Sequence, residues 1–457
     1  MIAGVGGDSG KTLATLGLIG AYRRKGIPVM PFKKGPDYID PAWLRLAAGK
    51  EARNLDTYLM GNQQVLRSFS QFAISDGINI MEANRGLHDG ENAQGTHSSA
   101  EMAKLLKCPV VIVIPVIKVT RTIAAILMGI KMFDPEVDFA GVILNQIATK
   151  RQGRVIRDAV ENEAGITVLG SLPRMKNDPL PGRHLGLVTP EESKIADKAI
   201  ELSARLIEDN VDLDEISRIA GNVPDIQIYS SSLADRVVKV SNRDRPIRIG
   251  YFTGSAFTFY YPENLEALSK DGFSIIPVNP FEITELPDIE ALYIGGGFPE
   301  THAAKLSSNR SVLKSVAEAA EKGLPIYAEC GGLMFLSKSL IWEGKTYPMA
   351  GVFDQTILIS KRPQGHGYQE VIVDSENPFF EMGQHLRGHE FHYSKIETDV
   401  NISTVFEVKR GVGVGGARDG LIHRNVLASY LHLHVSGAPA WADGMKKAAR
   451  RYSELQF

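Results

Sequence analysis

Short apolar segments that alternate with helix-like segments limit the folds open to the first half of this chain. Several of these segments are apolar throughout, as strands must be when helices cover both faces of their sheet. We expect strands at residues 27–32, 78–82, 109–116, 139–145 and 168–172. The pattern predicts an α/β domain with a mostly parallel sheet.

A charged, helix-like stretch separates this region from a second set of expected strands. It contains RLIEDNVDLDEISRIA and then the polar segment SNRDRP. The second set lies at residues 247–252, 273–278, 291–294, 326–328 and 426–431. A chain of 457 residues is also too long for one ordinary core. We predict two α/β domains, at residues 1–190 and 246–457, joined by a helical linker at residues 191–245.

The composition, 44% hydrophobic and 23% charged, is that of a globular protein. A formal net charge of -2 gives no electrostatic reason to expect a nucleic-acid partner. The N-terminus does not resemble a secretion signal, and no apolar run approaches the roughly 20 residues that cross a bilayer. We therefore expect a cytoplasmic protein with no membrane partner, in which Cys108 and Cys330 are free thiols.

The first residues, MIAGVGGDSGKTLATLGLIG, combine a short strand, a glycine-rich turn and a helix-like segment. Backbone N–H groups in such a turn bind phosphate, while Lys11 neutralises charge and Thr12 can ligate Mg²⁺. The turn is one residue longer than G-x-x-x-x-G-K-[ST], because Val5 stands at the first glycine position and Gly4 precedes it. A turn without a ligand is the alternative, but strand, loop, Gly10, Lys-Thr and helix follow in the order that a nucleotide site requires. Because the first strand is short, a start codon further upstream is left open.

Two acidic clusters follow expected strands, where the ligands of open α/β sheets collect. FKKGPDYIDP, residues 32–41, contains Asp37 and Asp40, and MEANRGLHDG, residues 81–90, contains Glu82 and Asp89. Each carboxylate alone would more often belong to a turn or a helix cap. Their occurrence together with the phosphate loop favours a site for ATP and Mg²⁺.

The segment PIYAECGGLM, residues 325–334, places Cys330 between an expected strand and two glycines. A cysteine is often only a small buried apolar residue, and Cys108 in KCPVVIVI is interpreted in that way. A tight strand-to-helix turn would instead expose the sulfur of Cys330 beside the N–H of Gly331. GGGFPE, residues 295–300, contains Gly296 and Gly297, which have the freedom to direct further N–H groups at an oxyanion.

Further motifs follow one another along the chain: ARNLDTYLM, AGVILNQ, VLGSLPR, FYYPENLEAL, YIGGGFPE, GHEFHYS and ASYLHLH. With the phosphate loop, the acidic clusters and YAECGGLMFL, they resemble the cobyrinic acid a,c-diamide synthase family over essentially the whole chain. The resemblance implies a P-loop, dethiobiotin-synthetase-like ATP-binding domain fused to a class I glutamine amidotransferase domain of flavodoxin-like fold. It also implies ATP- and glutamine-dependent amidation of the a and c acetate side chains of cobyrinic acid through an acyl phosphate.

For the nucleotide, the resemblance assigns roles to residues that match the family. Gly10, Lys11 and Thr12 would hold the ATP phosphates, with Lys33 as a further phosphate contact. Asn145, after its expected strand, would contact adenine.

For the metal and the acyl group, the resemblance points to the acidic clusters. Glu82 would ligate Mg²⁺ together with Thr12 and Asp40. Asp37, Asp40 and Asp89 would act at the acyl-phosphate centre and the substrate beside it.

For the glutaminase, the resemblance identifies Cys330 as the nucleophile and His432 as its base. Many class I glutaminases carry His-x-Glu at this place, whereas His434 stands here two residues after His432. Either another carboxylate orients His432, or His434 does so through a neutral hydrogen bond. The spacing of His389 and His392, or of His432 and His434, would also suit a metal, but no cysteine or carboxylate partners accompany them at zinc-like spacing.

The sequence departs from the family pattern at EANRGLHD, residues 82–89, and at VIPVIKVTR, residues 113–121. The Asn-Arg form resembles amidases that act on sirohydrochlorin or sirohaem. The alternative substrates are therefore sirohydrochlorin, its nickel complex and sirohaem. A nucleotide-switch ATPase of the partitioning type is an alternative from another class, and it would not need Cys330. In every enzyme interpretation the partners are glutamine and a tetrapyrrole carboxylic acid, and a homodimer is left open.

Overall fold

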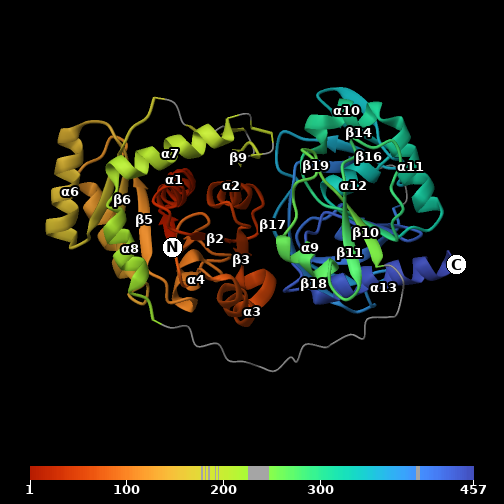
Figure 1. Cartoon of the computed structure of the whole chain (residues 1–457), viewed down its shortest axis with the longest axis horizontal. Coiled ribbons are helices and arrows are strands. Elements are labelled where there is room, and N and C mark those ends of the chain that lie inside the picture. The colour runs from red at the N-terminus through yellow and green to blue at the C-terminus, as the bar shows by residue number, and fades with distance from the viewer. Residues whose placement is uncertain are drawn as a thin grey trace. The chain divides into compact units, whose positions relative to one another are not determined.

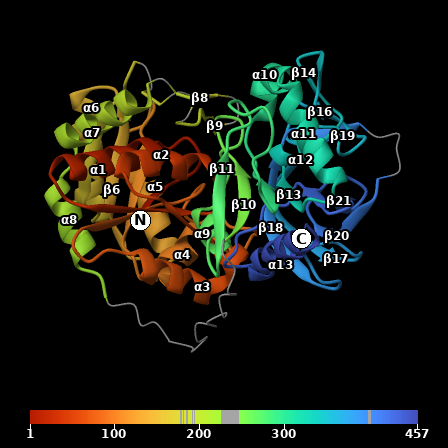
Figure 2. The same ribbon diagram turned by 45° about the vertical axis from the view of Figure 1, so that its right-hand side comes forward.

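The computed structural model describes residues 1–176, 179–180, 182–183, 186–190, 192–193, 195–224, 246–397 and 402–456. The chain divides into two compact units, Met1–Thr57 with Gly61–Ser231 and Tyr58–Met60 with Ser232–Phe457. In each unit helices pack around a central sheet (Figures 1 and 2). Within the described ranges, no helix combines the length and the apolarity that a bilayer crossing requires.

The first unit is built on a seven-stranded sheet in the order β3-β2-β4-β1-β5-β6-β7, in which every described pair is parallel. The strands are β1 (Ile2–Gly4), β2 (Val29–Lys34), β3 (Arg53–Leu55), β4 (Ile78–Glu82), β5 (Val110–Pro115), β6 (Phe139–Ile147) and β7 (Val168–Pro173). The five strands expected here are present, although β2 lies two residues later than predicted. β5 is buried at all positions but its last, as a continuous apolar run predicts for a central strand.

The helices of this unit are α1 (Lys11–Arg24), α2 (Ile39–Ala48), α3 (Thr57–Phe72), α4 (Ser99–Leu105), α5 (Thr122–Phe133), α6 (Lys150–Ala164), α7 (Ala196–Asn210) and α8 (Leu213–Gly221). A short ribbon joins β8 (Gly182–Arg183) and β9 (Gly186–Leu187). α7 packs closely on α1, because a Cβ at Gly17 would lie only 2.4 Å from Cγ1 of Ile207. α7 and α8 fall within the predicted linker, of which residues 191, 194 and 225–245 lie outside the described residues. The predicted domain boundaries stay a prediction.

The second unit is built on a nine-stranded sheet in the order β11-β10-β12-β13-β22-β21-β20-β17-β18. Its strands are β10 (Ile247–Phe252), β11 (Phe273–Val278), β12 (Ala291–Ile294), β13 (Ile326–Glu329), β17 (Gly365–Val373), β18 (His385–His392), β20 (Thr404–Arg410), β21 (Arg418–His423) and β22 (Val426–Ser429). The pairs from β11 to β22 are parallel, and those from β22 to β18 are antiparallel. All five expected strands are found among the parallel ones.

A smaller sheet and several helices complete this unit. The smaller sheet has the order β15-β14-β16-β19 and consists of β14 (Ser339–Trp342), β15 (Lys345–Pro348), β16 (Thr356–Ile359) and β19 (Ser394–Glu397). The helices are α9 (Pro262–Leu268), the 3₁₀ turn η1 (Pro299–His302), α10 (Ala303–Ser308), α11 (Arg310–Glu321), α12 (Gly331–Leu336) and α13 (Pro439–Leu455). Both units are therefore α/β, and the fold class predicted from the sequence is confirmed.

β22 ends earlier than the predicted strand at residues 426–431. The N–H of Tyr430 donates to the carboxylate of Asp419 at 3.2 Å instead of continuing the ladder. The chain then forms a backbone bridge between His432 and His389, in which the His432 N–H donates to the His389 carbonyl at 2.8 Å. Leaving the ladder at this point brings His432 to the end of the parallel strands.

Candidate active sites

β1 runs through the glycine-rich loop directly into α1. Gly10 precedes the helix with φ 91, a left-handed conformation that glycine adopts without strain. Lys11 turns its Nζ back toward the loop and donates to the carbonyl of Gly6 at 2.7 Å and to Oγ of Ser9 at 3.4 Å. Nδ2 of Asn145 donates to the carbonyl of Ser9 at 3.0 Å, and a Cβ at Gly10 would lie 2.1 Å from that nitrogen. The structure thus places Asn145 against the phosphate loop, and the loop surrounds the side-chain nitrogen of Lys11.

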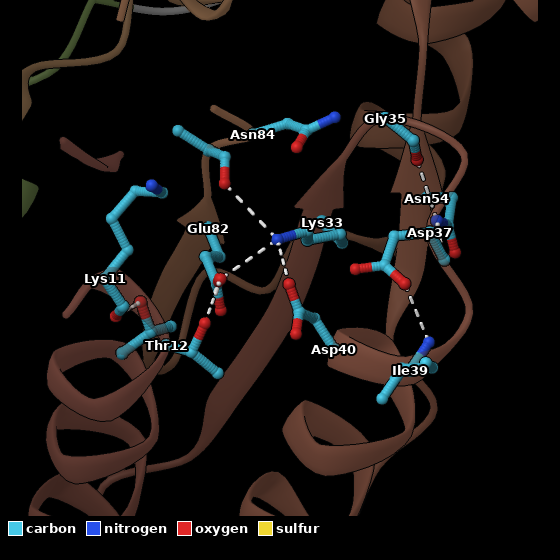
Figure 3. A network of polar contacts seen from close by, with 12 residues as sticks. Lys11, Thr12, Lys33, Gly35, Asp37, Ile39, Asp40, Asn54, Glu82 and Asn84 are labelled. Carbon is cyan, nitrogen blue, oxygen red and sulfur yellow. Dashed lines mark hydrogen bonds and ion pairs between the residues drawn. The ribbon is translucent and has the colours of Figure 1, made fainter. Parts of the chain in front are cut away.

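Four polar side chains from α1, β2, α2 and β4 form one network at the carboxyl ends of β2 and β4 (Figure 3). Oγ1 of Thr12 donates to Oε1 of Glu82 at 2.8 Å. Nζ of Lys33 donates to the same Oε1 at 2.9 Å and to Oδ2 of Asp40 at 2.5 Å. Lys33 and Glu82 are paired residues of the parallel neighbours β2 and β4, so the two strand ends bring them together. The proximity expected for the two acidic clusters is therefore present for Asp40 and Glu82.

Burial and charge act against each other in this network. Burial raises the pKa of Glu82 to about 7, although the charge of Lys33 opposes the change. Burial also acts to raise the pKa of Asp40, but the ammonium of Lys33 outweighs it and holds that pKa below its usual value. Burial would lower the pKa of Lys33, and the carboxylates of Asp40 and Glu82 raise it instead. Lys33 therefore stays charged inside the site.

The two remaining acidic residues differ in their surroundings. Oδ1 of Asp37 accepts from the N–H of Ile39 at 2.8 Å, at the start of α2. Burial, followed by the charge of Asp40, raises the pKa of Asp37 well above its usual range. Asp89 is exposed and accepts from the N–H of Gly86 at 2.9 Å. Among the described residues, Asp37 is coupled to the network, whereas Asp89 makes no hydrogen bond to it.

The oxygen atoms of this network fit a magnesium ion. Oε2 of Glu82 is buried and has no hydrogen-bond partner within the described part of the chain. The hydroxyl of Thr12 lies beside the same carboxylate. No three His, Cys, Asp or Glu side chains gather into a metal cage in the described ranges. That arrangement suits a Mg²⁺ ion with one or two ligands from the protein. Nucleotide phosphates and water would supply the other ligands.

In the second unit, β13 turns sharply into α12 at Cys330. Cys330 has φ 45 and ψ -92, which is strained for a residue with a side chain, and its N–H donates to the carbonyl of Ser429 at 2.7 Å. A Cβ at Gly331 would lie 3.0 Å from the N of Gly297, and one at Gly332 would lie 2.4 Å from the carbonyl oxygen of Ile294. Both glycines are needed because the loop after β12 passes so close. The turn therefore has the strand-to-helix geometry predicted for a nucleophile.

His432 lies beside the loop that contacts the turn at Cys330. A Cβ at Gly296 would be 2.7 Å from Cε1 of the His432 ring, so the GGGFPE loop contacts both the cysteine turn and the histidine. Nδ1 of His432 lies 3.3 Å from Oε2 of Glu329, which is fully buried. The structure brings together Cys330, His432 and the three glycines predicted to surround an oxyanion: Gly296, Gly297 and Gly331.

The thiol of Cys330 is protonated in this arrangement at neutral pH. Burial raises its pKa, and the carboxylates of Glu300 and Glu329 add to the increase. His432, assigned from the resemblance as the base of Cys330, is expected to raise the thiolate fraction. In the ligand-free protein the surroundings favour the neutral thiol, so a base has to remove the proton during the reaction.

Comparison with known proteins places both units in one family. Residues 1–187 match the CobQ/CobB/MinD/ParA nucleotide binding domain, and residues 248–440 match the CobB/CobQ-like glutamine amidotransferase domain. The cobyrinate a,c-diamide synthase of Magnetococcus marinus is 41% identical over 438 residues, which cover 95% of this chain and 93% of that protein. This chain belongs to the cobyrinate a,c-diamide synthase family.

Other cobyrinate a,c-diamide synthases are similar over their full length. The protein of Caldanaerobacter subterraneus is 37% identical over 457 residues, covering 100% of this chain and 98% of that one. The protein of Archaeoglobus fulgidus is 38% identical over 453 residues, covering 99% and 97%. The resemblance stated from the motifs is confirmed. As a member of the cobyrinate a,c-diamide synthase family, the chain is an ATP-dependent carbon–nitrogen ligase that uses glutamine as its amido donor.

In this member of the cobyrinate a,c-diamide synthase family, one residue near the thiol was missed as a functional candidate. The motifs do not single out Glu329, and they leave the group that orients His432 open. A signal was present, because a glutamate at the end of the apolar run PIYAE has to find a partner when it is buried. The sequence did not say that this partner would be His432.

Proposed function

We propose that this chain amidates the a and c acetate side chains of cobyrinic acid, with ATP as the activating substrate and glutamine as the nitrogen donor. One observation carries the proposal. A chain that is similar over its whole length to cobyrinate a,c-diamide synthases has the network of Thr12, Lys33, Asp40 and Glu82 in one unit, and the turn at Cys330 with His432 beside it in the other. The first arrangement suits phosphoryl transfer, and the second suits release of ammonia.

In the first unit, a substrate carboxylate would attack the γ-phosphorus of ATP. The bond to ADP breaks, and the product is an acyl phosphate. Ammonia then attacks the acyl carbon, the carbon–oxygen bond to phosphate breaks, and the amide forms. Catalysis of the first step is mainly positioning and neutralisation of charge, which we assign to the loop N–H groups, Lys11 and Lys33.

Glu82 and Thr12 would hold Mg²⁺, with Asp40 beside them. The ion supplies positive charge that offsets the charge of the phosphate oxygens during transfer. Lys33 keeps Asp40 and Glu82 in place through its two ion pairs. Asp37 would face the substrate from the start of α2, and Asn145 would contact the base of the nucleotide. Asp89 is proposed at the substrate side of the site.

In the second unit, Sγ of Cys330 would attack the side-chain amide carbon of glutamine. The thiol proton passes to His432, and His432 then gives a proton to the departing ammonia. The N–H groups of Gly296, Gly297 and Gly331 would stabilise the oxyanion. Water finally hydrolyses the thioester and releases glutamate. Because the resting thiol is neutral, the base is required in the attack itself.

The proposed reaction defines the partners and the compartment. Glutamine, ATP and a tetrapyrrole acid are small molecules, and ATP and glutamine are abundant in the cytoplasm, where we place the protein. A homodimer is compatible with this chemistry. A partitioning-type ATPase would need no glutaminase residues, and the strained turn at Cys330 beside His432 argues for an enzyme instead.

A mass-spectrometric assay tests the substrate. Purified protein is incubated with ATP, Mg²⁺, glutamine and one acid at a time: cobyrinic acid, sirohydrochlorin, Ni-sirohydrochlorin or sirohaem. We expect cobyrinic acid to exchange two OH groups for NH₂, and no exchange without ATP. Several acids are compared because Asn84 departs from the family pattern. Asn84 packs against Gly35 of the segment FKKGPDYIDP, and its Nδ2 would lie 2.9 Å from a Cβ added at Gly35. Exchange on a sirohydrochlorin compound alone would replace cobyrinic acid as the substrate.

A further inference from the structure

We propose that Glu329 is the positioning residue that orients His432 for the reaction at Cys330. The residue directly before the nucleophile would thereby supply the carboxylate that His-x-Glu supplies elsewhere. This inference rests on the glutaminase role proposed above for Cys330 and His432.

The first argument is that the carboxylate of Glu329 is held rigidly. It ends β13, where it pairs with Ser429 of β22, and its side chain is completely buried. Oε1 accepts from the N–H of Leu433 at 3.2 Å, and Oε2 accepts from the hydroxyl of Tyr293 at 3.0 Å. A carboxylate anchored at both oxygens can fix the direction of a third partner.

That third partner is the ring of His432. Its Nδ1 lies 3.3 Å from Oε2 of Glu329, a distance that suits an N–H donor to a carboxylate before substrate binds. Donation from Nδ1 leaves Nε2 without a proton in the neutral ring. Nε2 is then the atom that can accept the thiol proton of Cys330. The proton moves only from sulfur to Nε2 and onward to ammonia, and Glu329 takes no part in the proton transfer.

The ring is also held by its neighbours. His389 stacks on His432 with ring centroids 4.9 Å apart and an interplanar angle of 20°. Burial, followed by the charge of His432, lowers the pKa of His389 well below its usual value, so His389 is a neutral neighbour. With Gly296 against Cε1, the position of the ring is set by packing, while Glu329 sets its tautomer.

His434, the other group considered from the sequence, is directed elsewhere. Its Nε2 lies 3.6 Å from Oε2 of Glu263. Its Nδ1 accepts from the N–H of Ser436 at 3.2 Å. Both ring nitrogens of His434 therefore face groups other than His432, which leaves Glu329 as the orienting group.

The test compares Glu329→Gln with two controls. Glu390→Gln removes another buried carboxylate, which accepts from the backbone N–H groups of Val412 and Gly413, and His434→Gln removes the rival group. We expect E329Q to lower kcat for glutamine hydrolysis by at least about 10²-fold with KM for glutamine unchanged, because the amide places N–H where a carboxylate is required. Amidation with ammonium salt should be retained in all three variants, and both controls should hydrolyse glutamine within about threefold of the wild type.

Three further measurements separate the outcomes. If Cys330→Ala still hydrolyses glutamine, the glutaminase proposal itself fails. If C330A and His432→Gln are inactive while E329Q keeps the wild-type kcat, only the role of Glu329 is overturned. Should E329Q not fold, the wild-type protein decides: ¹⁵N shifts of the His432 ring, identified by their loss in H432Q, are expected to show the Nδ1–H tautomer. An Nε2–H tautomer would contradict the proposal.

Discussion

Thr12 and Glu82 are joined by a 2.8 Å hydrogen bond from Oγ1 to Oε1, although 70 residues separate them in the chain. Thr12 is the second residue of the helix that follows the phosphate loop, and Glu82 ends β4, so the contact links the start of α1 to the strand that leads into the acidic cluster. The second oxygen of Glu82 is left for another ligand. We therefore expect the binding of nucleotide and the binding of Mg²⁺ to depend on each other through this pair.

Replacing Lys11 by Ala should abolish amidation with glutamine and with ammonium salt alike. Lys11 is the first residue of α1 and donates from Nζ to the carbonyl of Gly6 in the phosphate loop, so its replacement would remove the charge proposed to stabilise the transferred phosphoryl group. Product formation is measured by mass spectrometry with each nitrogen source. Lys25→Ala is the matched control, because that exposed lysine lies just beyond the other end of α1, and it should keep full activity. Persistent amidation in K11A would contradict activation by ATP.

Replacing Glu82 by Gln should weaken the dependence of nucleotide binding on Mg²⁺. The amide keeps the shape of the side chain but loses the negative charge and one of the two oxygen atoms that can bind the ion. ADP binding is measured by calorimetry with and without Mg²⁺, and we expect the gain in affinity on adding Mg²⁺ to fall by about tenfold or more. Glu101→Gln, an exposed change in the same unit, serves as control. An unchanged gain in E82Q would remove Glu82 from the proposed metal ligands.

The parallel strands could be predicted from the sequence because a buried strand of this kind is a run of consecutive apolar residues. β10, β11 and β12 coincide with the expected ranges. β3 was missed because Arg53 and Asn54 are polar residues in a three-residue strand, and their burial comes from tertiary contacts. The antiparallel strands β17 and β18 were missed because GHGYQEVIV and HLRGHEFH contain glycine and charged residues that weaken the strand pattern.

The sites show the same division between local and long-range information. Lys11, Thr12 and Cys330 were predicted because each stands in a local motif with glycines at a turn. The contact of Glu329 with His432 spans 103 residues and depends on the pairing of β13 with β22, which no local pattern contains. The pairing of Lys33 with Glu82 likewise follows from strand order.

Replacing Cys330 by Ala should abolish amidation with glutamine while leaving at least half of the activity with ammonium salt. In the proposed mechanism the thiol serves only to release ammonia, and the activation of the carboxylate depends on residues of the other unit. The rates with the two nitrogen sources are compared at saturating ATP. Cys108→Ala is the control, since Cys108 heads the strand β5 and contacts neither site in the described structure. Loss of both activities in C330A would refute a separate glutaminase role.

Alkylation of Cys330 in the ligand-free protein should accelerate as the pH rises and should not level off below pH 9. Burial and two carboxylates raise the pKa of this thiol, so only a small fraction is thiolate at neutral pH. Because iodoacetamide reacts with the thiolate, the rate should increase about tenfold per pH unit up to that point. The measurement uses the Cys108→Ala protein, in which Cys330 is the only cysteine, with mass-spectrometric detection. A plateau between pH 6 and 8 would mean that His432 already holds the thiolate before glutamine binds. The resting state would then be an ion pair, and proton removal would no longer be part of the attack.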